Sequence, residues 1–165
     1  MIKNFFRNIK YAIKNLLYYF PIIIKDRDWS HEYILDLLEH KLKKMQKSIS
    51  EQGIGCHQTI GKIYDEMEVV LHCLEQLRED DFYKDEDDAF QKKWGPAKMV
   101  FLPIPGDPHG CSTMRILRPF VTNAKEEEQA SKEQMDIYKL GDKRKRETIE
   151  KLFSELSKNI ENWWD

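Results

Sequence analysis

Apolar residues recur at helical spacing along most of this chain, and this periodicity limits the folds that it can adopt. Residues three and four positions apart lie on one face of an α-helix, so each row predicts an amphipathic helix. The expected helices cover residues 2–20, 28–49 and 59–79, a short segment through Phe90 and Trp94, a polar segment 126–138, and a last segment beyond Gly141. The sequence therefore predicts an all-α protein, a bundle of four to six helices in a single helical domain over residues 1–165.

The last of these segments ends on two adjacent tryptophans, Trp163 and Trp164. Chain ends are usually polar and loose unless packing holds them, so we expect this terminus to be docked on the fold. Adjacent helical residues point about 100° apart, so one indole should face the core and the other a groove or a partner. Arg27 and Trp29 are either an anion-binding guanidinium and a stacking face, or structural residues beside a helix cap at Asp28. In the structural alternative Arg27 pairs with Asp26 or the terminal carboxylates, and Trp29 fills the core beside Trp163.

Composition excludes several classes of protein. Charged residues make up 34% of the chain and hydrophobic residues 41%, as in helix-rich globular proteins rather than disordered ones. The net charge of −2 gives no overall basic field for nucleic acid. Three cysteines without paired spacing favour a reducing compartment, the cytoplasm. The apolar run 16–24 is too short to span a bilayer.

The first 25 residues are basic, with five Lys or Arg side chains and no acidic one. Such a helix can lie on an anionic membrane or on nucleic acid. Its apolar stripe is broad and aromatic, which fits packing inside the bundle equally well, and we expect that packing. Surplus apolar positions over residues 2–24 also favour a homodimer.

Residues 96–119 break the helical pattern, because five of the six prolines lie there. We expect a long Pro/Gly-rich loop, with a short extended piece at Met99–Leu102, and long loops in compact domains are often functional. Its polar side chains could cradle a phosphate: His109, Ser112, Thr113, Arg115 and Arg118. The spacing matches neither a Walker loop nor a cysteine-phosphatase loop, and an ordinary ordered loop is the alternative.

No metal site and no cofactor are expected. The His–Cys neighbours Cys56-His57, His72-Cys73 and His109/Cys111 lack the paired spacing of zinc ligands. Asp36-x-x-Glu39 gives half of the carboxylate pattern of the all-α nucleotide pyrophosphohydrolases, whereas the next helix holds Asp65 and Glu66 but no ExxD. The acidic stretch 79–88 is either a solvated charge run or a cation site.

Two segments carry distinctive motifs. Asp26-Arg27-Asp28-Trp29 precedes a YxLxLLxxKLxxM pattern from Tyr33 to Met45, and LFxxLxxxIxxWWD runs from Leu152 to Asp165. With these motifs the chain resembles a group of small uncharacterised proteins of tailed bacteriophages, whose usual DRDWD carries an acid where this chain has Ser30. The resemblance covers residues 20–50 and 150–165. It implies a phage-encoded accessory protein in the host bacterial cytoplasm and carries no assigned activity.

The sequence thus predicts a non-enzymatic protein without catalytic residues that acts by binding. One hypothesis is the sequestration of a small anionic, nucleotide-type host defence signal. Its ligand-binding residues would be Arg27, Trp29, His109, Ser112, Thr113, Arg115, Arg118, Trp163 and Trp164. A second hypothesis is an interaction module that inhibits or recruits a host protein. The third is a metal-dependent nucleotide hydrolase.

Overall fold

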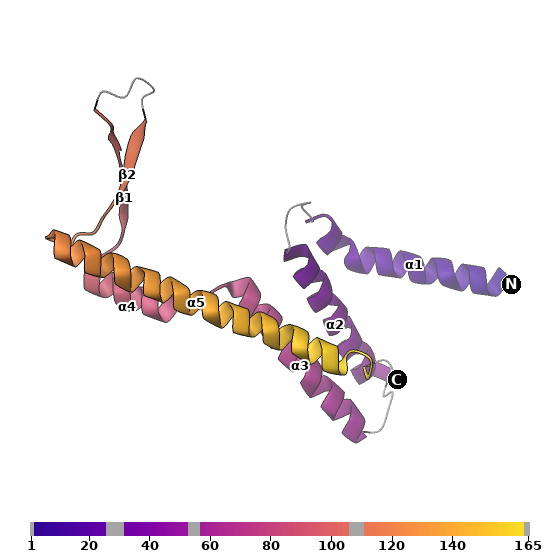
Figure 1. Ribbon diagram of the computed structural model, residues 1–165. Helices are drawn as coiled ribbons and strands as arrows, with labels where there is room; N and C mark the ends of the chain where they lie inside the picture. Colours follow the sequence, from indigo (N-terminus) through magenta and orange to yellow (C-terminus); the bar gives the residue numbers. More distant parts are fainter. Residues whose placement is uncertain (1, 26–31, 53–56, 106–110, 164–165) are drawn as a thin grey trace. The chain divides into compact units, whose positions relative to one another are not determined.

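Helices dominate the part of the chain that the computed structural model describes, residues 2–25, 32–52, 57–105 and 111–163 (Figure 1). The elements are α1 (Ile2–Ile23), α2 (Glu32–Gln52), α3 (His57–Glu79), α4 (Lys84–Trp94), β1 (Lys98–Pro103), β2 (Ser112–Leu117) and α5 (Ala124–Asn159). The prediction of a predominantly helical protein is confirmed. Packing divides the chain into two compact units, where the sequence predicts one domain: Met1–Glu79 with Thr148–Asp165, and Asp80–Glu147. Helix α5 contributes residues to both.

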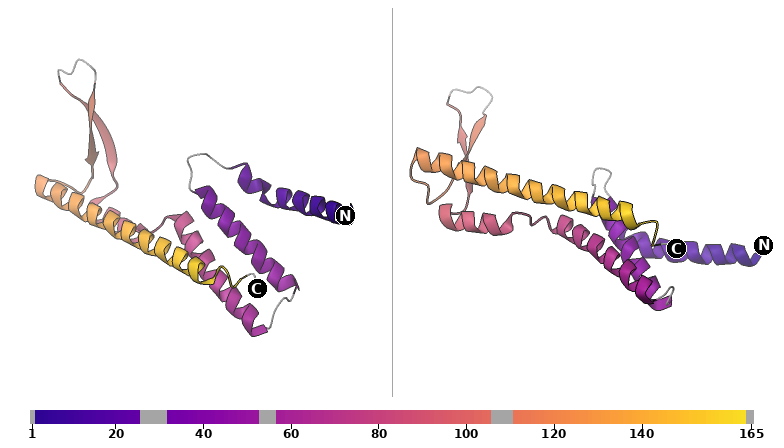
Figure 2. Two further views of the ribbon diagram at one scale, coloured as in Figure 1. Left: turned by 45° about the vertical axis from the view of Figure 1, so that its right-hand side comes forward. Right: turned by 60° about the horizontal axis from the view of Figure 1, so that its bottom comes forward.

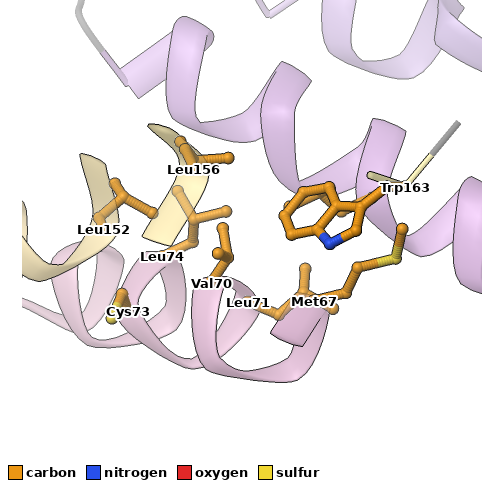
Figure 3. Packing of buried hydrophobic residues seen from close by; sticks show 9 residues of the cluster. Met67, Val70, Leu71, Cys73, Leu74, Leu152, Leu156 and Trp163 are labelled. Carbon is orange, nitrogen blue, oxygen red and sulfur yellow. The ribbon is translucent and has the colours of Figure 1, made fainter. Parts of the chain in front are cut away.

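The first unit has its core between α2, α3 and the C-terminal part of α5 (Figure 3). The buried residues are Leu42, Met67, Val70, Leu71, Cys73, Leu74, Leu152, Leu156 and Trp163. The α3 residues among them repeat at three- and four-residue intervals, which is why one face of that helix is buried. Trp163 is 5% exposed, and its Nε1 donates a hydrogen bond to Glu66 Oε2 at 3.1 Å. Trp163 is therefore docked on the fold, as the sequence predicts for this segment.

Polar contacts tie α2 to α3 beside this core. Gln46 Nε2 donates to Glu68 Oε1 at 2.8 Å, which satisfies a buried amide. Arg78 Nη2 lies 2.8 Å from Glu39 Oε2, and Lys43 also donates to the Glu39 carboxylate. Burial acts to raise the pKa of Glu39, but the hydrogen bonds from Lys43 and Arg78 outweigh it, so the pKa is lowered. Glu39 therefore stays ionised and holds the two helices together.

Helix α1 leaves its apolar row exposed, which corrects the expectation that this row packs into the bundle. The exposed residues are Phe5, Phe6, Ile9, Ile13, Leu16, Leu17 and Phe20. Contact with α2 instead involves Tyr18, whose carbonyl accepts from His40 Nε2 at 2.9 Å, and Asn15, which accepts from Lys44 Nζ at 2.8 Å. At about 100° per residue, these contact residues lie on the opposite side of α1 from the row. In Figures 1 and 2, α1 meets α2 near the C-terminal end of α1.

No helix within the described residues combines the length and the apolar character that crossing a membrane requires.

The second unit is built on the packing of α4 against the N-terminal part of α5. Phe90, Trp94 and Ala130 are buried between them. Arg144 clamps Glu86 with two parallel hydrogen bonds, Nη2 to Oε1 at 2.6 Å and Nη1 to Oε2 at 3.0 Å. Bidentate pairs of this kind fix orientation as well as adding stability.

The sequence predicts that Gly141 separates two helices, but this residue lies inside α5. A Cβ at this position would stand 2.6 Å from Tyr83 Cδ1 and 3.2 Å from Tyr83 Cβ. The Tyr83 ring in turn makes an edge contact with Tyr138, at 5.5 Å between centroids. Gly141 is therefore explained by the close approach of an aromatic side chain and not by a helix end.

Residues 98–103 and 112–117 form an antiparallel β-hairpin, which corrects the prediction of a loop over 96–119. The extended piece predicted at Met99–Leu102 lies within β1. Pro103 is tolerated because it closes the strand, opposite Ser112, in a sheet whose two strands are both edges. Figures 1 and 2 both show the hairpin projecting from the helical part of its unit.

Candidate functional site

One face of the β-hairpin carries four large apolar side chains. Residues alternate between the two faces of a strand, and directly paired residues share a face. The pairs Met99–Ile116 and Phe101–Met114 therefore lie on the same side. Their exposed fractions are 63% for Met99, 65% for Phe101, 52% for Met114 and 42% for Ile116. These four residues are termed the hairpin face.

The other described residues of the hairpin give this face no cover. The opposite face is mixed, with the pairs Lys98–Leu117, Val100–Arg115 and Leu102–Thr113. Every residue of β2 is exposed, and within β1 Val100 alone is partly buried. A two-stranded hairpin is at best marginally stable alone in water, and contiguous exposed apolar patches mark interaction sites. The hairpin face thus has the properties of a contact surface.

The base of the hairpin is tightly held. Gly95, just before β1, packs so closely on Pro119, just after β2, that a Cβ on Gly95 would lie 2.4 Å from Pro119 Cγ. Arg118 Nη1 donates to the Gly95 carbonyl at 2.8 Å, and Nη2 donates to Gln134 Oε1 at 3.2 Å. The Arg118 guanidinium also lies over the Phe90 ring, 4.5 Å from its centroid. Arg118 therefore fastens both ends of the hairpin to α4 and α5.

Glu133 on α5 links this helix to α4 through hydrogen bonds. Its carboxylate accepts hydrogen bonds from Lys93 Nζ at 2.7 Å, Trp94 Nε1 at 2.7 Å and Gln129 Nε2 at 2.9 Å. The hydrogen bonds from Lys93 and Trp94 favour the ionised form and lower the pKa of Glu133 to about 2, although burial acts in the opposite direction. The carboxylate is thus ionised at any physiological pH.

This shift makes the second unit acid-sensitive. Because the folded-state pKa of Glu133 lies below its ordinary value of 4.5, its contribution is complete above that pH and is lost as the pH falls toward about 2. We expect Glu133→Gln to cost about 1 kcal/mol at neutral pH, a figure discounted for the 34% exposure of the side chain. The variant should also flatten the dependence of melting temperature on pH over that range. Glu128→Gln, at an exposed position of the same helix, is the control, and equal pH profiles for both variants would contradict the assignment.

A groove of about 700 Å³ lies between β2 and the start of α5. Its walls include Arg115, Arg118, Asn123, Glu127 and Gln134. Asn123 caps α5, since its Oδ1 accepts from the backbone N–H of Glu126 at 3.0 Å. Arg118 and Gln134 are hydrogen-bonded to each other. The negative charge of the Glu127 carboxylate would repel an anionic ligand. Arg115 is the cation best placed to meet a ligand there.

The structure brings two of the residues predicted to bind a ligand, Arg115 and Arg118, to this groove. Ser112 and Thr113 are exposed on β2, at adjacent positions and therefore on opposite faces. Trp163 is a core residue of the first unit. Arg27, Trp29, His109 and Trp164 lie outside the described residues. The hairpin face itself was not predicted, although Met114, Arg115 and Ile116 show the period-two alternation of a strand.

Two carboxylates of the hydrolase hypothesis, Glu39 and Glu66, have partners within the first unit. Glu39 is held by Arg78 and Lys43, and Glu66 accepts from Trp163 and lies 3.6 Å from Lys62. Within the described ranges, no group of three or more His, Cys, Asp or Glu side chains is arranged to hold a metal ion. These contacts give Glu39 and Glu66 a structural role in the first unit.

The acidic stretch 79–88 runs into the first turn of α4. There Asp85, Glu86 and Asp87 interact favourably with the positive end of the helix dipole. Asp80 pairs with Lys145 of α5 at 2.8 Å, and Glu86 is clamped by Arg144. The acids that have these partners stabilise the second unit.

Comparison with protein-family models, with curated proteins and with solved structures finds no match to this chain.

Proposed function

We propose that the protein acts by binding a partner protein through the hairpin face, Met99, Phe101, Met114 and Ile116. The single observation that carries the proposal is this exposed apolar surface on a projecting hairpin. Exposed aromatic and methionine side chains are enriched where proteins meet, and burying them supplies the affinity. The outer edges of β1 and β2 pair with no other strand among the described residues, and they offer a partner strand additional main-chain hydrogen bonds.

The rigid base of the hairpin supports the same function. Gly95, Pro119 and Arg118 fix its direction, so less conformational entropy is lost when a partner binds. The resemblance to small tailed-phage proteins suggests a bacterial host protein as the partner. A second copy of the chain, forming the homodimer that the sequence predicts, would use the same chemistry.

Sequestration of a small anionic ligand is the second candidate, favoured by the groove beside Arg115. It is the weaker one, because Arg118 already donates to Gly95 and Gln134, and Glu127 repels an anion. Such a ligand would be bound by Arg115 and by the hydroxyl of Ser131 on the groove wall.

Photo-crosslinking tests the protein-binding function. A photoreactive phenylalanine analogue at Phe101 should crosslink a partner in bacterial lysate, whereas the same analogue at Thr113, on the opposite face, should not. The mass of the product identifies the partner, and twice the mass of the chain would identify a homodimer.

Affinity then separates the two faces. Met114→Asp should weaken binding of the crosslinked partner at least about tenfold, because a charge enters an apolar contact. Thr113→Asp adds the same charge one residue away on the other face and should leave affinity within about twofold. Equal loss in both variants, or no crosslink from Phe101, would contradict the proposal.

A further inference from the structure

Helix α1 carries an apolar row that is not explained by its contacts with the rest of the described chain. Seven large side chains, Phe5, Phe6, Ile9, Ile13, Leu16, Leu17 and Phe20, are 40% to 70% exposed. The helix is fastened to α2 through Tyr18 and Asn15, on its other side. The row is therefore free to bind something else while that contact stays intact.

The charges of α1 indicate what it binds. The first 25 residues hold five basic side chains and no acidic one, in a chain whose net charge is −2. At about 100° per residue, Arg7, Lys10 and Lys14 fall together along one flank of the apolar row. An apolar row with a cationic flank complements a surface that is apolar inside and anionic outside, which is the surface of an anionic lipid bilayer.

We propose that α1 lies in the interface of an anionic lipid bilayer. The row of phenylalanine, isoleucine and leucine side chains enters the acyl boundary, and Arg7, Lys10 and Lys14 lie at the headgroup phosphates. The helix lies along the surface and does not cross it, in keeping with the absence of a spanning helix among the described residues.

A second copy of the chain fits this row less well. Two α1 helices joined antiparallel by their rows would bring Lys10 and Lys14 of one copy near the same residues of the other, and residues 1–25 offer no acid to neutralise them. Like charges brought together oppose association. Nucleic acid would satisfy the cations but leave the apolar row in water.

Vesicle flotation with the full chain tests the proposal. The protein should float with vesicles of equal parts phosphatidylglycerol and phosphatidylcholine at low salt, and stay in solution with pure phosphatidylcholine. Leu16→Asp should weaken binding at least about tenfold, since it places a charge among the inserted side chains. Asn8→Asp adds the same charge on the polar side and is the matched control, with at most about fivefold weakening. Lys10→Gln should also weaken binding about fivefold.

The remaining outcomes decide against the proposal. No flotation with the anionic vesicles would overturn it, and so would equal flotation with both lipid mixtures. Loss of self-association in Leu16→Asp without vesicle binding would identify a second copy as the occupant. Binding to a DNA duplex that Leu16→Asp leaves unchanged, without flotation, would identify nucleic acid. Met114→Asp should float like the wild type, so this test is independent of the hairpin face.

Discussion

Replacing Trp163 by alanine is expected to lower the free energy of unfolding of the first unit by about 3–5 kcal/mol. Trp163 is 5% exposed, beside Met67 and Leu71 of α3 (Figure 3), so truncation leaves a large cavity between α3 and the end of the chain. It also removes the indole N–H that donates a hydrogen bond to Glu66, whose side chain is only 19% exposed. Urea unfolding followed by circular dichroism measures the loss.

Trp163→Phe separates the two contributions. Phenylalanine keeps most of the apolar contact and loses the hydrogen bond, so we expect a cost of about 1–2 kcal/mol. If the alanine variant lost no more than the phenylalanine variant, packing at Trp163 would not be what stabilises this unit.

The core around Trp163 is the part of the fold that sequence patterns predict best. The rows on α3 and α5 have a helical period, and this period alone predicts that both are apolar seams. Periodicity reports which face of a helix is apolar, but it does not report what covers that face. This is why the row on α1 was predicted to be buried, when the α1–α2 contact uses Tyr18 and Asn15 instead.

The second unit was predicted less well because its glycines and prolines serve tertiary contacts. Gly141 makes room for Tyr83, which comes from a distant part of the sequence, so a local interpretation takes it for a helix end. The prolines around β1 and β2 mark the limits of a hairpin, but their density is also typical of a loop. The sequence predicts that Arg118 binds an anion, but its N–H groups donate to Gly95 and Gln134 instead. Residue spacing does not predict these two contacts.

Gly95→Ala is expected to be the most damaging small substitution in the second unit, with a cost of about 2–4 kcal/mol. Gly95 has φ of 81° and ψ of 164°, a backbone conformation almost restricted to glycine that costs an L-residue about 1–3 kcal/mol. Its new Cβ would also lie 2.4 Å from Pro119 Cγ and 2.6 Å from Pro119 Cδ, and relieving such overpacking costs about 1–3 kcal/mol. Gly61→Ala in α3 is the matched control, because no neighbouring atom lies within 4 Å of the added Cβ. That change should instead stabilise the protein by about 0.5–1 kcal/mol through helix propensity.

The location of Gly95 gives this substitution a second consequence. Gly95 and Pro119 lie at the two ends of the hairpin, and Arg118 holds them to α4 and α5. Relieving the clash must move one end of the hairpin, so the direction of the hairpin face should become less well defined. If that face binds a partner, Gly95→Ala should weaken binding even at temperatures where the variant remains folded, because the hairpin then loses more entropy on binding.

Hydrogen exchange should show faster exchange in β1 and β2 and unchanged exchange in α2 and α3. Unchanged partner affinity in a variant with a loosened hairpin would mean that the rigid base is needed for stability and not for recognition.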